Sequence, residues 1–156
     1  MALRYVERYA TTRAKLGHYL RRKLADRGWD GEAAPPVDAL VQKMAERGYV
    51  NDRDFAAMKA RSLTARGYGA RRIDLALRAA GVSEDDVSSE LGERQEDDDL
   101  AAALAYARRR RIGPFARQAP DADARRKALA ALLRAGHSFE IARRILAEDY
   151  CPNSGQ

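Results

Sequence analysis

The stretch that decides the fold is LRAAGVS at residues 77–83. A helical run ends there at Gly81, one apolar residue follows, and Ser83 is a residue type that caps a new helix. Related stretches are LADRGWD at residues 24–30 and LLRAGHS at residues 132–138. Their glycines lie 53 and 55 residues apart along the chain. This spacing predicts three tandem three-helix units of about fifty residues each.

The ends of the helices share further sequence features. The triplet Arg-Gly-aromatic occurs at residues 27–29, 47–49 and 66–68. Glycine suits the left-handed position after a helix, and the residue that follows can fold back onto the last turn. In the three related stretches Asp30, Ser83 and Ser138 stand where the cap of the next helix would be. We therefore expect a new helix to follow directly after each of them.

Apolar spacing predicts nine helices and no sheet. Ala, Arg and Leu dominate, and no stretch shows the regular apolar and polar alternation of a strand. Apolar residues instead recur at helical spacing. The expected helices cover residues 3–9, 13–27, 37–47, 52–65, 70–80, 84–91, 98–112, 122–135 and 139–148.

The fold class that follows is all-α. Many helix faces are narrow and rich in alanine, so each unit depends on its neighbours, as in other helical arrays. We expect three tandem three-helix repeats in an elongated, curved array. The repeats are expected at residues 1–50, 51–94 and 95–150, followed by a flexible tail at residues 151–156.

Charge is unevenly distributed along the 156 residues. The net charge is +4 over residues 1–50, −4 over residues 51–99 and +6 over residues 100–156, which gives +6 in total. Two basic ends therefore flank an acidic middle. These charges are either an ordinary solvated surface or a footprint for nucleic acid, because clustered cations bind phosphates and release counterions.

The chain lacks the residue patterns of common catalytic and metal sites. Cys151 is the only cysteine, and His18 and His137 are far apart in sequence, so no disulfide framework or His/Cys metal site is expected. Phosphate-binding glycine loops and nucleophile elbows do not occur. We expect a protein that is not an enzyme and has no cofactor. Short apolar runs and the absence of a signal peptide indicate a cytoplasmic protein with no membrane span.

What remains is a set of basic clusters on the predicted helices. Each of them alone is typical of a solvated helix face, but five clusters at comparable places in repeated units suggest a discontinuous stripe. The stripe would bind DNA phosphates or acidic protein groups. The candidate partner- and nucleic-acid-binding residues are Arg21, Arg22, Lys23, Arg71, Arg72, Arg108, Arg109, Arg110, Arg111, Arg125, Arg126, Lys127, Arg143 and Arg144.

The order of these motifs resembles the RecX family, regulatory proteins of the RecA recombinase. The resemblance runs from about residue 3 to residue 149. It is carried by LRRKL with RGW at residues 20–29, by GYVND, FA, GYG, RI, L and GV between residues 48 and 82, and by AL, LLR, G, SFE and IL between residues 128 and 146. The sequence departs from the family at Lys15, where a Glu usually completes a capping box, and at His137, where Phe or Tyr is more usual.

The resemblance implies a partner and an activity. Members of the family bind RecA, chiefly its filament on single-stranded DNA, and lie in the filament groove. They inhibit ATP hydrolysis, strand exchange and coprotease activity in DNA recombination, repair and the SOS response. By this resemblance we expect a non-enzymatic RecA regulator, monomeric, with weak binding to single- or double-stranded DNA.

Two other functions fit the same residues. Repeated three-helix units with basic helices also resemble helix-turn-helix DNA-binding proteins. No unit, however, groups Asn, Gln and Arg near the start of a helix as a recognition helix does. The other alternative is a helical-repeat adaptor for a different protein, which would neither affect RecA nor bind much DNA.

Overall fold

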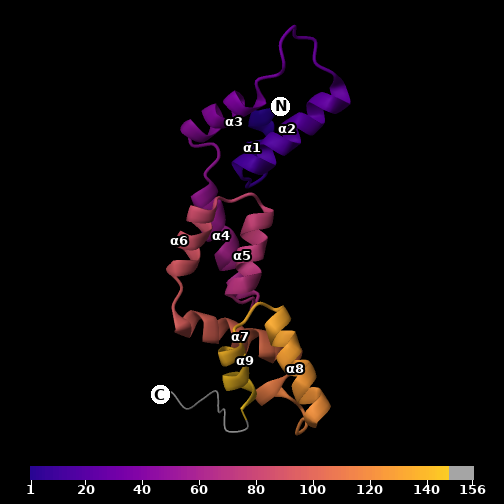
Figure 1. Cartoon of the computed structure of the whole chain (residues 1–156), viewed down its shortest axis with the longest axis vertical. Helices are drawn as coiled ribbons and strands as arrows, with labels where there is room; N and C mark the ends of the chain where they lie inside the picture. Colours follow the sequence, from indigo (N-terminus) through magenta and orange to yellow (C-terminus); the bar gives the residue numbers. More distant parts are fainter. Residues whose placement is uncertain (148–156) are drawn as a thin grey trace. The chain divides into compact units, whose positions relative to one another are not determined.

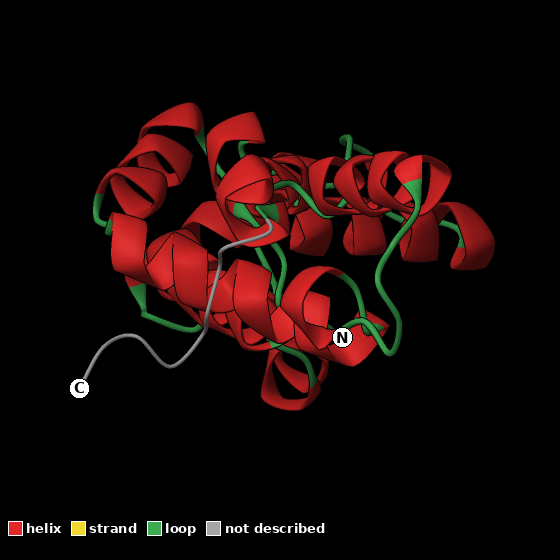
Figure 2. Cartoon of the chain, turned by 90° about the horizontal axis from the view of Figure 1, so that it is seen from below, coloured by secondary structure: helices red, strands yellow, loops and turns green. Residues whose placement is uncertain are grey.

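The computed structural model describes residues 1–147, which contain α-helices, one short 3-10 helix and no strand (Figures 1 and 2). The all-α prediction is confirmed for this part of the chain. The α-helices are α1 (Ala2–Arg8), α2 (Arg13–Arg27), α3 (Val37–Glu46), α4 (Asp52–Ala65), α5 (Ala70–Ala79), α6 (Glu84–Gly92), α7 (Glu96–Arg110), α8 (Ala122–Arg134) and α9 (Phe139–Leu146), with η1 (Gly113–Phe115) between α7 and α8.

The predicted helix bounds are close to those of the structure. Two helices, α2 and α4, have the ranges expected from the sequence, and most others differ by one residue at an end. The start of α7 lies two residues earlier than predicted, where the Gln95 backbone N–H donates to the Asp98 carboxylate at 3.4 Å. Its end lies two residues earlier, because Arg111 is left-handed and Gly113-Pro114 begins η1. The predicted tail at residues 151–156 lies outside the described residues.

One predicted cap is wrong. No helix follows Asp30, and the next helix begins at Val37 after Pro36. Consecutive prolines at 35 and 36 disfavour helical backbone at Ala34 and Pro35, so a helix capped by Asp30 would have to end after about one turn. Ser83 and Ser138 do cap the helices that follow: their hydroxyls accept from the backbone N–H of Asp86 at 3.2 Å and of Ile141 at 3.1 Å.

The glycine stops have the expected geometry. Gly67 and Gly81 have φ of 78° and 74°, and the glycines at 28, 48 and 136 also have positive φ. The backbone N–H of Tyr68 donates to the Leu63 carbonyl at 3.0 Å, which closes the end of α4 in the way that glycine caps do. Trp29 differs, because it is half exposed and its indole N–H donates forward to the Ala33 carbonyl at 2.7 Å.

The described chain forms two compact units that do not coincide with the predicted repeats. Unit 1 is Met1–Met58 with Leu77–Glu90, and unit 2 is Lys59–Ala76 with the residues from Leu91 onward. Both α4 and α5 therefore contribute one part to each unit. The repeat boundaries at residues 50 and 94 stay predictions, as does the elongated, curved form of the array.

In unit 1 the core lies where α1, α2 and α3 meet. Leu16 and Leu20 of α2 are buried with Val37, Val41 and Met44 of α3. These residues recur every three or four positions, so each helix presents one apolar stripe to the other.

The core of unit 2 is built by α7, α8 and α9. Small residues of α7, such as Ala103 and Ala107, are fully buried against Leu132 of α8 and Ile145 of α9. Alanines let the helices approach closely, and the larger side chains of α8 and α9 fill the space between them. Within residues 1–147 no helix is both long and apolar enough to cross a membrane.

Candidate partner- and nucleic-acid-binding surfaces

The predicted basic residues are divided between the two units. The cluster on α2 belongs to unit 1, whereas the clusters on α5, α7, α8 and α9 belong to unit 2. Each of the fourteen side chains is exposed except Lys23, which is half-buried. The stripe that would join all five clusters spans both units and stays a prediction, so each cluster is described within its own unit.

The three predicted side chains on α2 have three different environments. Arg21 forms an ion pair with Asp38 of α3, and Lys23 lies 3.8 Å from Asp26 of its own helix. Arg22 points elsewhere and lines a cleft described below. Consecutive residues on a helix are separated by about 100°, so neighbours in sequence do not share a face. Arg21 and Arg22 therefore line two different hollows, Arg21 beside Trp29 and Asp38 and Arg22 beside Tyr19.

At the end of α7 the predicted cluster packs on aromatic rings. The Arg108 guanidinium lies 5.1 Å from the Phe115 ring centroid, and those of Arg109 and Arg110 lie 5.7 Å from that of Tyr106. Such cation–π contacts hold exposed arginines in place without neutralising them. Their positive charges also interact favourably with the negative end of the helix dipole. Three arginines thus lie together in the last turn of α7.

The predicted residues on α8 and α9 are partly neutralised. Asp123 accepts ion pairs from Arg126 at 2.5 Å and from Lys127 at 2.6 Å. Arg144 of α9 lies 3.2 Å from Glu96 of α7. Exposed pairs of this kind contribute little to stability, and phosphate can displace them.

The remaining predicted residues of unit 2 have three different surroundings: the first turn of α5, a cavity beside η1, and an aromatic ring of α9. Arg71 and Arg72 occupy the first turn of α5, where the Arg71 backbone N–H donates to the Gly136 carbonyl at 3.2 Å. Arg111 and Arg125, fourteen residues apart, line one cavity of about 560 Å³ beside η1. The Arg143 guanidinium lies 5.9 Å from the Phe139 ring centroid.

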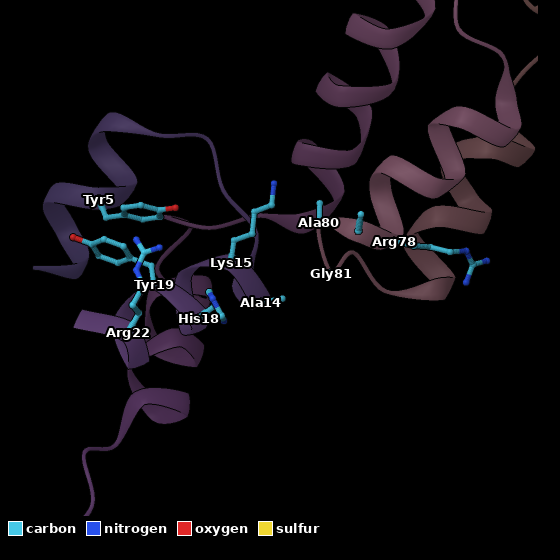
Figure 3. A pocket seen from close by; sticks show the side chains of 10 residues that line it. Tyr5, Ala14, Lys15, His18, Tyr19, Arg22, Arg78, Ala80 and Gly81 are labelled. Carbon is cyan, nitrogen blue, oxygen red and sulfur yellow. The ribbon is translucent and has the colours of Figure 1, made fainter. Parts of the chain in front are cut away.

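Unit 1 contains a basic cleft between α2 and the turn from α5 to α6, which we call the α2 cleft (Figure 3). Its volume is about 460 Å³. The lining residues are Tyr5, Ala14, Lys15, His18, Tyr19, Arg22, Arg78, Ala79, Ala80 and Gly81. Three of these ten side chains are cationic and none is acidic.

The cations and the aromatic rings of the α2 cleft come largely from one helix. Lys15, His18, Tyr19 and Arg22 follow the spacing of a single helix face, opposite the buried Leu16 and Leu20. Tyr19 stacks on Tyr5 of α1, with ring centroids 4.0 Å apart and planes inclined by 17°. Figure 3 shows Arg22 beside Tyr19, and Arg78 across the cleft pointing away from the tyrosines.

Sequence reasoning missed Lys15, the tyrosine pair and Arg78 as members of one site. The helical spacing of residues 15, 18, 19 and 22 was a signal that could have found the α2 face. The opposite wall comes from residues about sixty positions later, and no pattern in the sequence indicated that it closes on α2.

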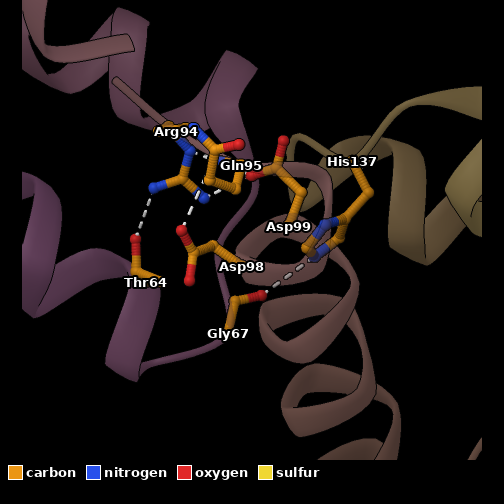
Figure 4. Close-up of polar contacts among 7 residues, drawn as sticks. All are labelled: Thr64, Gly67, Arg94, Gln95, Asp98, Asp99 and His137. Carbon is orange, nitrogen blue, oxygen red and sulfur yellow. Dashed lines mark hydrogen bonds and ion pairs between the residues drawn. The ribbon is translucent and has the colours of Figure 1, made fainter. Parts of the chain in front are cut away.

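Unit 2 contains a second polar centre, at the contact between two glycine turns (Figure 4). The Gly69 backbone N–H donates to the Ala135 carbonyl at 2.9 Å, and a ring nitrogen of His137, Nε2, lies 3.0 Å from the Gly67 carbonyl oxygen. His137 is fully buried. Among residues 1–147 no group of His, Cys, Asp and Glu could hold a metal ion.

The protonation state of His137 follows from these contacts. A carbonyl only accepts, so Nε2 carries the proton, and Nδ1 is buried with no partner. Burial lowers the pKa of His137 below 6.5, outweighing the opposing effects of the Gly67 carbonyl and the Asp99 carboxylate. The side chain is therefore neutral at physiological pH and serves the core.

Arg94 contributes further polar contacts to this centre of unit 2. Its side chain is about 10% exposed, and it binds the Asp99 carboxylate through Nε at 2.9 Å and the Thr64 hydroxyl at 2.8 Å. It thereby ties the last turns of α4 to the first turn of α7 (Figure 4). We assign this centre a structural role, in contrast to the exposed cations.

These features define a class of protein. It is all-helical, it carries exposed arginines and a basic cleft, and it has buried polar contacts between its helices. Residues 51–91 match the family model described as RecX, second three-helix domain. The chain is 40% identical to the Regulatory protein RecX of Myxococcus xanthus, over 93% of this chain and 81% of that protein. It is 37% identical to the Regulatory protein RecX of Xanthomonas campestris, over 83% of this chain and 78% of that protein.

The fold agrees with these sequence comparisons. The crystal structure of RecX from Lactobacillus salivarius matches with a TM-score of 0.74, covering 93% of this chain and 89% of that one at 18% identity. The chain belongs to the RecX family of regulatory proteins. The family resemblance and the three-helix repeat fold expected from the sequence are thereby confirmed.

Proposed function

We propose that this protein regulates the RecA recombinase without catalysing a reaction itself. It binds the RecA filament on single-stranded DNA, lies in the filament groove and inhibits ATP hydrolysis, strand exchange and coprotease activity. The observation that carries the proposal is the 40% identity to a regulatory protein RecX over 93% of the chain.

The exposed cations support this proposal. Arg108, Arg109 and Arg110 are held on aromatic rings and project charge from the end of α7. A filament of protein and nucleic acid offers carboxylates and phosphates, and clustered arginines bind both. We propose that the other predicted basic residues of α2, α5, α8 and α9 contribute to the same contact surface, with one three-helix repeat at each of residues 1–50, 51–94 and 95–150.

The primary experiment measures ATP hydrolysis by the cognate RecA on single-stranded DNA while this protein is added. We expect inhibition at well below one copy per RecA, as for a protein that caps or destabilises filaments. The protein alone should hydrolyse no ATP. Normal RecA turnover at equimolar protein would overturn the proposal and direct attention to the helix-turn-helix and adaptor alternatives.

A charge reversal tests the contact surface. In the variant Arg108→Glu/Arg109→Glu we expect at least tenfold more protein to be needed for half-inhibition, because several phosphate or carboxylate contacts become repulsive. A matched control is Lys43→Glu/Arg47→Glu, which makes the same change in net charge at two exposed residues of unit 1 outside the predicted set. Equal weakening of inhibition in both variants would show that only net charge matters.

The protein is further proposed to be monomeric and cytoplasmic, and to bind free DNA weakly. Light scattering after size-exclusion chromatography tests the monomer, and cell fractionation tests the location. Binding of a short duplex separates this proposal from the helix-turn-helix alternative. A weak, sequence-independent affinity that falls steeply with salt fits a RecA regulator, whereas salt-resistant selection of one duplex sequence fits a repressor-like protein.

A further inference from the structure

We propose that the α2 cleft is a binding site for one nucleotide of single-stranded DNA, present on the free protein. Lys15 and Arg22 would hold the phosphate, and the stacked pair Tyr5 and Tyr19 would receive the base. The argument depends on charge, aromatic surface and size, all within unit 1.

The charge of the cleft selects an anion. Lys15 and Arg22 occupy one face of α2 with His18 between them, and no acidic side chain lines the cleft. Elsewhere in the described chain several cations are paired with carboxylates, as Arg21 is with Asp38 and Arg126 with Asp123. Lys15 instead lies 5.1 Å from the Phe55 ring centroid, which leaves its charge available to a ligand.

The aromatic pair distinguishes a nucleotide from other anions. Tyr5 and Tyr19 are both partly exposed and already stack on each other, so their rings are held in place before a ligand arrives. Proteins that bind single strands combine a cationic groove with aromatic rings on which bases stack. An acidic peptide would use the cations and gain little from two rigid rings.

The dimensions also favour a single strand. A volume of about 460 Å³ is at the lower end of the roughly 300–1,000 Å³ typical of small-ligand sites, which fits one nucleotide. The bases of a duplex are already stacked and paired, so their faces cannot reach the tyrosines. The α2 cleft should therefore prefer single strands over duplex.

The wall opposite α2 is held rigidly. The Thr12 hydroxyl donates to the Ala80 carbonyl at 2.5 Å, and Gly81 lies against Ala14, where a side chain on residue 81 would collide. The turn from α5 to α6 thus fixes the width of the cleft. Arg78 also belongs to this wall and forms an ion pair with Glu84 at 3.4 Å, so the phosphate is assigned to Lys15 and Arg22.

The first test is binding of a fluorescent oligothymidylate to the full chain, followed by anisotropy at several salt concentrations. We expect Arg22→Glu to weaken binding about tenfold at low salt and to make the slope of log affinity against log salt shallower by about 0.7, as expected when one phosphate is no longer neutralised. The matched control Arg27→Glu reverses an exposed charge on the same helix outside the cleft and should change affinity less than twofold. Equal weakening by both variants would overturn the proposal.

A second variant tests the aromatic part. We expect Tyr5→Leu to weaken oligothymidylate binding at least fivefold, because base stacking on the ring is removed. Its salt dependence should stay unchanged, because the phosphate keeps both of its cations. Circular dichroism and thermal unfolding would confirm that the variant folds. A folded Tyr5→Leu that binds normally would contradict the nucleotide assignment.

Two further measurements distinguish a single-stranded nucleic acid from an acidic peptide as the ligand. Photocrosslinking of unmodified protein to an iodouracil-substituted strand should label the peptides that contain Tyr5 or Tyr19, and labelling confined to other peptides would overturn the site. Polyglutamate should compete with the strand poorly. Equally strong competition by polyglutamate would overturn the nucleotide assignment in favour of a general acidic-peptide surface, and preferred binding of duplex would overturn it in favour of a different DNA site.

This inference is separable from RecA regulation, because the binding assays contain no RecA. A folded Tyr5→Leu variant that no longer binds the strand and still inhibits RecA ATP hydrolysis would support the cleft as an independent site, because Tyr5 is outside the basic residues proposed to contact RecA. Failure of the unmodified protein to inhibit RecA, together with normal strand binding, would instead concern only the proposed function.

Discussion

Two glycine turns on either end of α5 are anchored in different ways. The turn that ends α5, at Gly81, belongs to unit 1 and is fixed by one hydroxyl, that of Thr12, on the Ala80 carbonyl. The turn that precedes α5, at residues 67–69, belongs to unit 2 and lies backbone to backbone against residues 135–137. The first turn combines a side-chain hydrogen bond with the close approach of Gly81 to Ala14, whereas the second is held by contacts between backbone atoms.

The difference predicts where each unit is vulnerable. In unit 2 the space at Gly69 and Gly136 is too small for a methyl group, and buried polar groups of Arg94 and His137 surround it. In unit 1 the cost of removing the Thr12 hydroxyl should be that of a single buried hydrogen bond. Gly69→Ala should therefore destabilise the protein more than loss of the Thr12 hydroxyl does.

Gly69→Ala should be strongly destabilising. A Cβ on residue 69 would lie 2.5 Å from the Gly136 carbonyl carbon and 2.6 Å from the His137 nitrogen, both backbone atoms that cannot move aside cheaply. We expect the free energy of unfolding to fall by about 3 kcal/mol in urea denaturation. Gly92→Ala is the control, because nothing lies within 4 Å of its Cβ, and it should change stability by less than about 1 kcal/mol.

Arg94→Leu should lower the unfolding free energy by about 2 kcal/mol, because it leaves the partly buried Asp99 carboxylate without its cation. Arg126→Leu removes an ion pair from a side chain that is 80% exposed and should cost less than about 1 kcal/mol. Similar decreases in the two variants, measured by urea denaturation, would show that the buried network contributes no more than a surface ion pair.

Thr12→Val should lower the unfolding free energy by about 1–2 kcal/mol, since it removes both the bond to Ala80 and the cap on the Lys15 backbone N–H. Its neighbour provides the control. The Thr11 hydroxyl is buried without a hydrogen-bond partner, so Thr11→Val should leave thermal stability unchanged or raise it. A larger decrease at Thr11 than at Thr12 would contradict this account of the unit 1 turn.

The pH dependence due to His137 should be the smallest of these effects. Its pKa is lowered in the folded protein, so the unfolded state binds more protons as the pH falls below about 6.5. The stabilising contribution of the neutral imidazole is fully present above pH 6.5 and is lost as the pH falls toward the folded pKa. In His137→Phe we expect this part of the slope to disappear from urea midpoints measured between pH 7 and pH 5. An unchanged slope would assign it to other groups.

The ends of α4 and α5 could be predicted from local sequence. The glycine after each helix was sufficient to place these ends, because the signal for a left-handed residue lies within a few positions of the helix end. The failed cap at Asp30 had an equally local cause, the two prolines after it. Neither turn, however, carried a signal for its distant partner.

The candidate sites could likewise be predicted only in part from the sequence. Counting cations located exposed arginines on α7, but it grouped Arg21, Arg22 and Lys23 although they point to three different environments. It also missed Lys15 and Tyr5, because the α2 cleft exists only once the turn from α5 to α6 reaches α2. Contacts between segments sixty residues apart are set by tertiary packing, which a single sequence does not show.

The interleaving of the two units has a consequence for synthesis on the ribosome. Unit 1 needs residues 77–90, so its first 58 residues emerge long before their last contacts can form. By then residues 59–76, the first part of unit 2, have also emerged and must wait for α7 to α9. Folding from the N-terminus therefore cannot finish one unit before the other has begun. The nascent chain should gain protease resistance in two late steps, one after residue 90 and the other near its end.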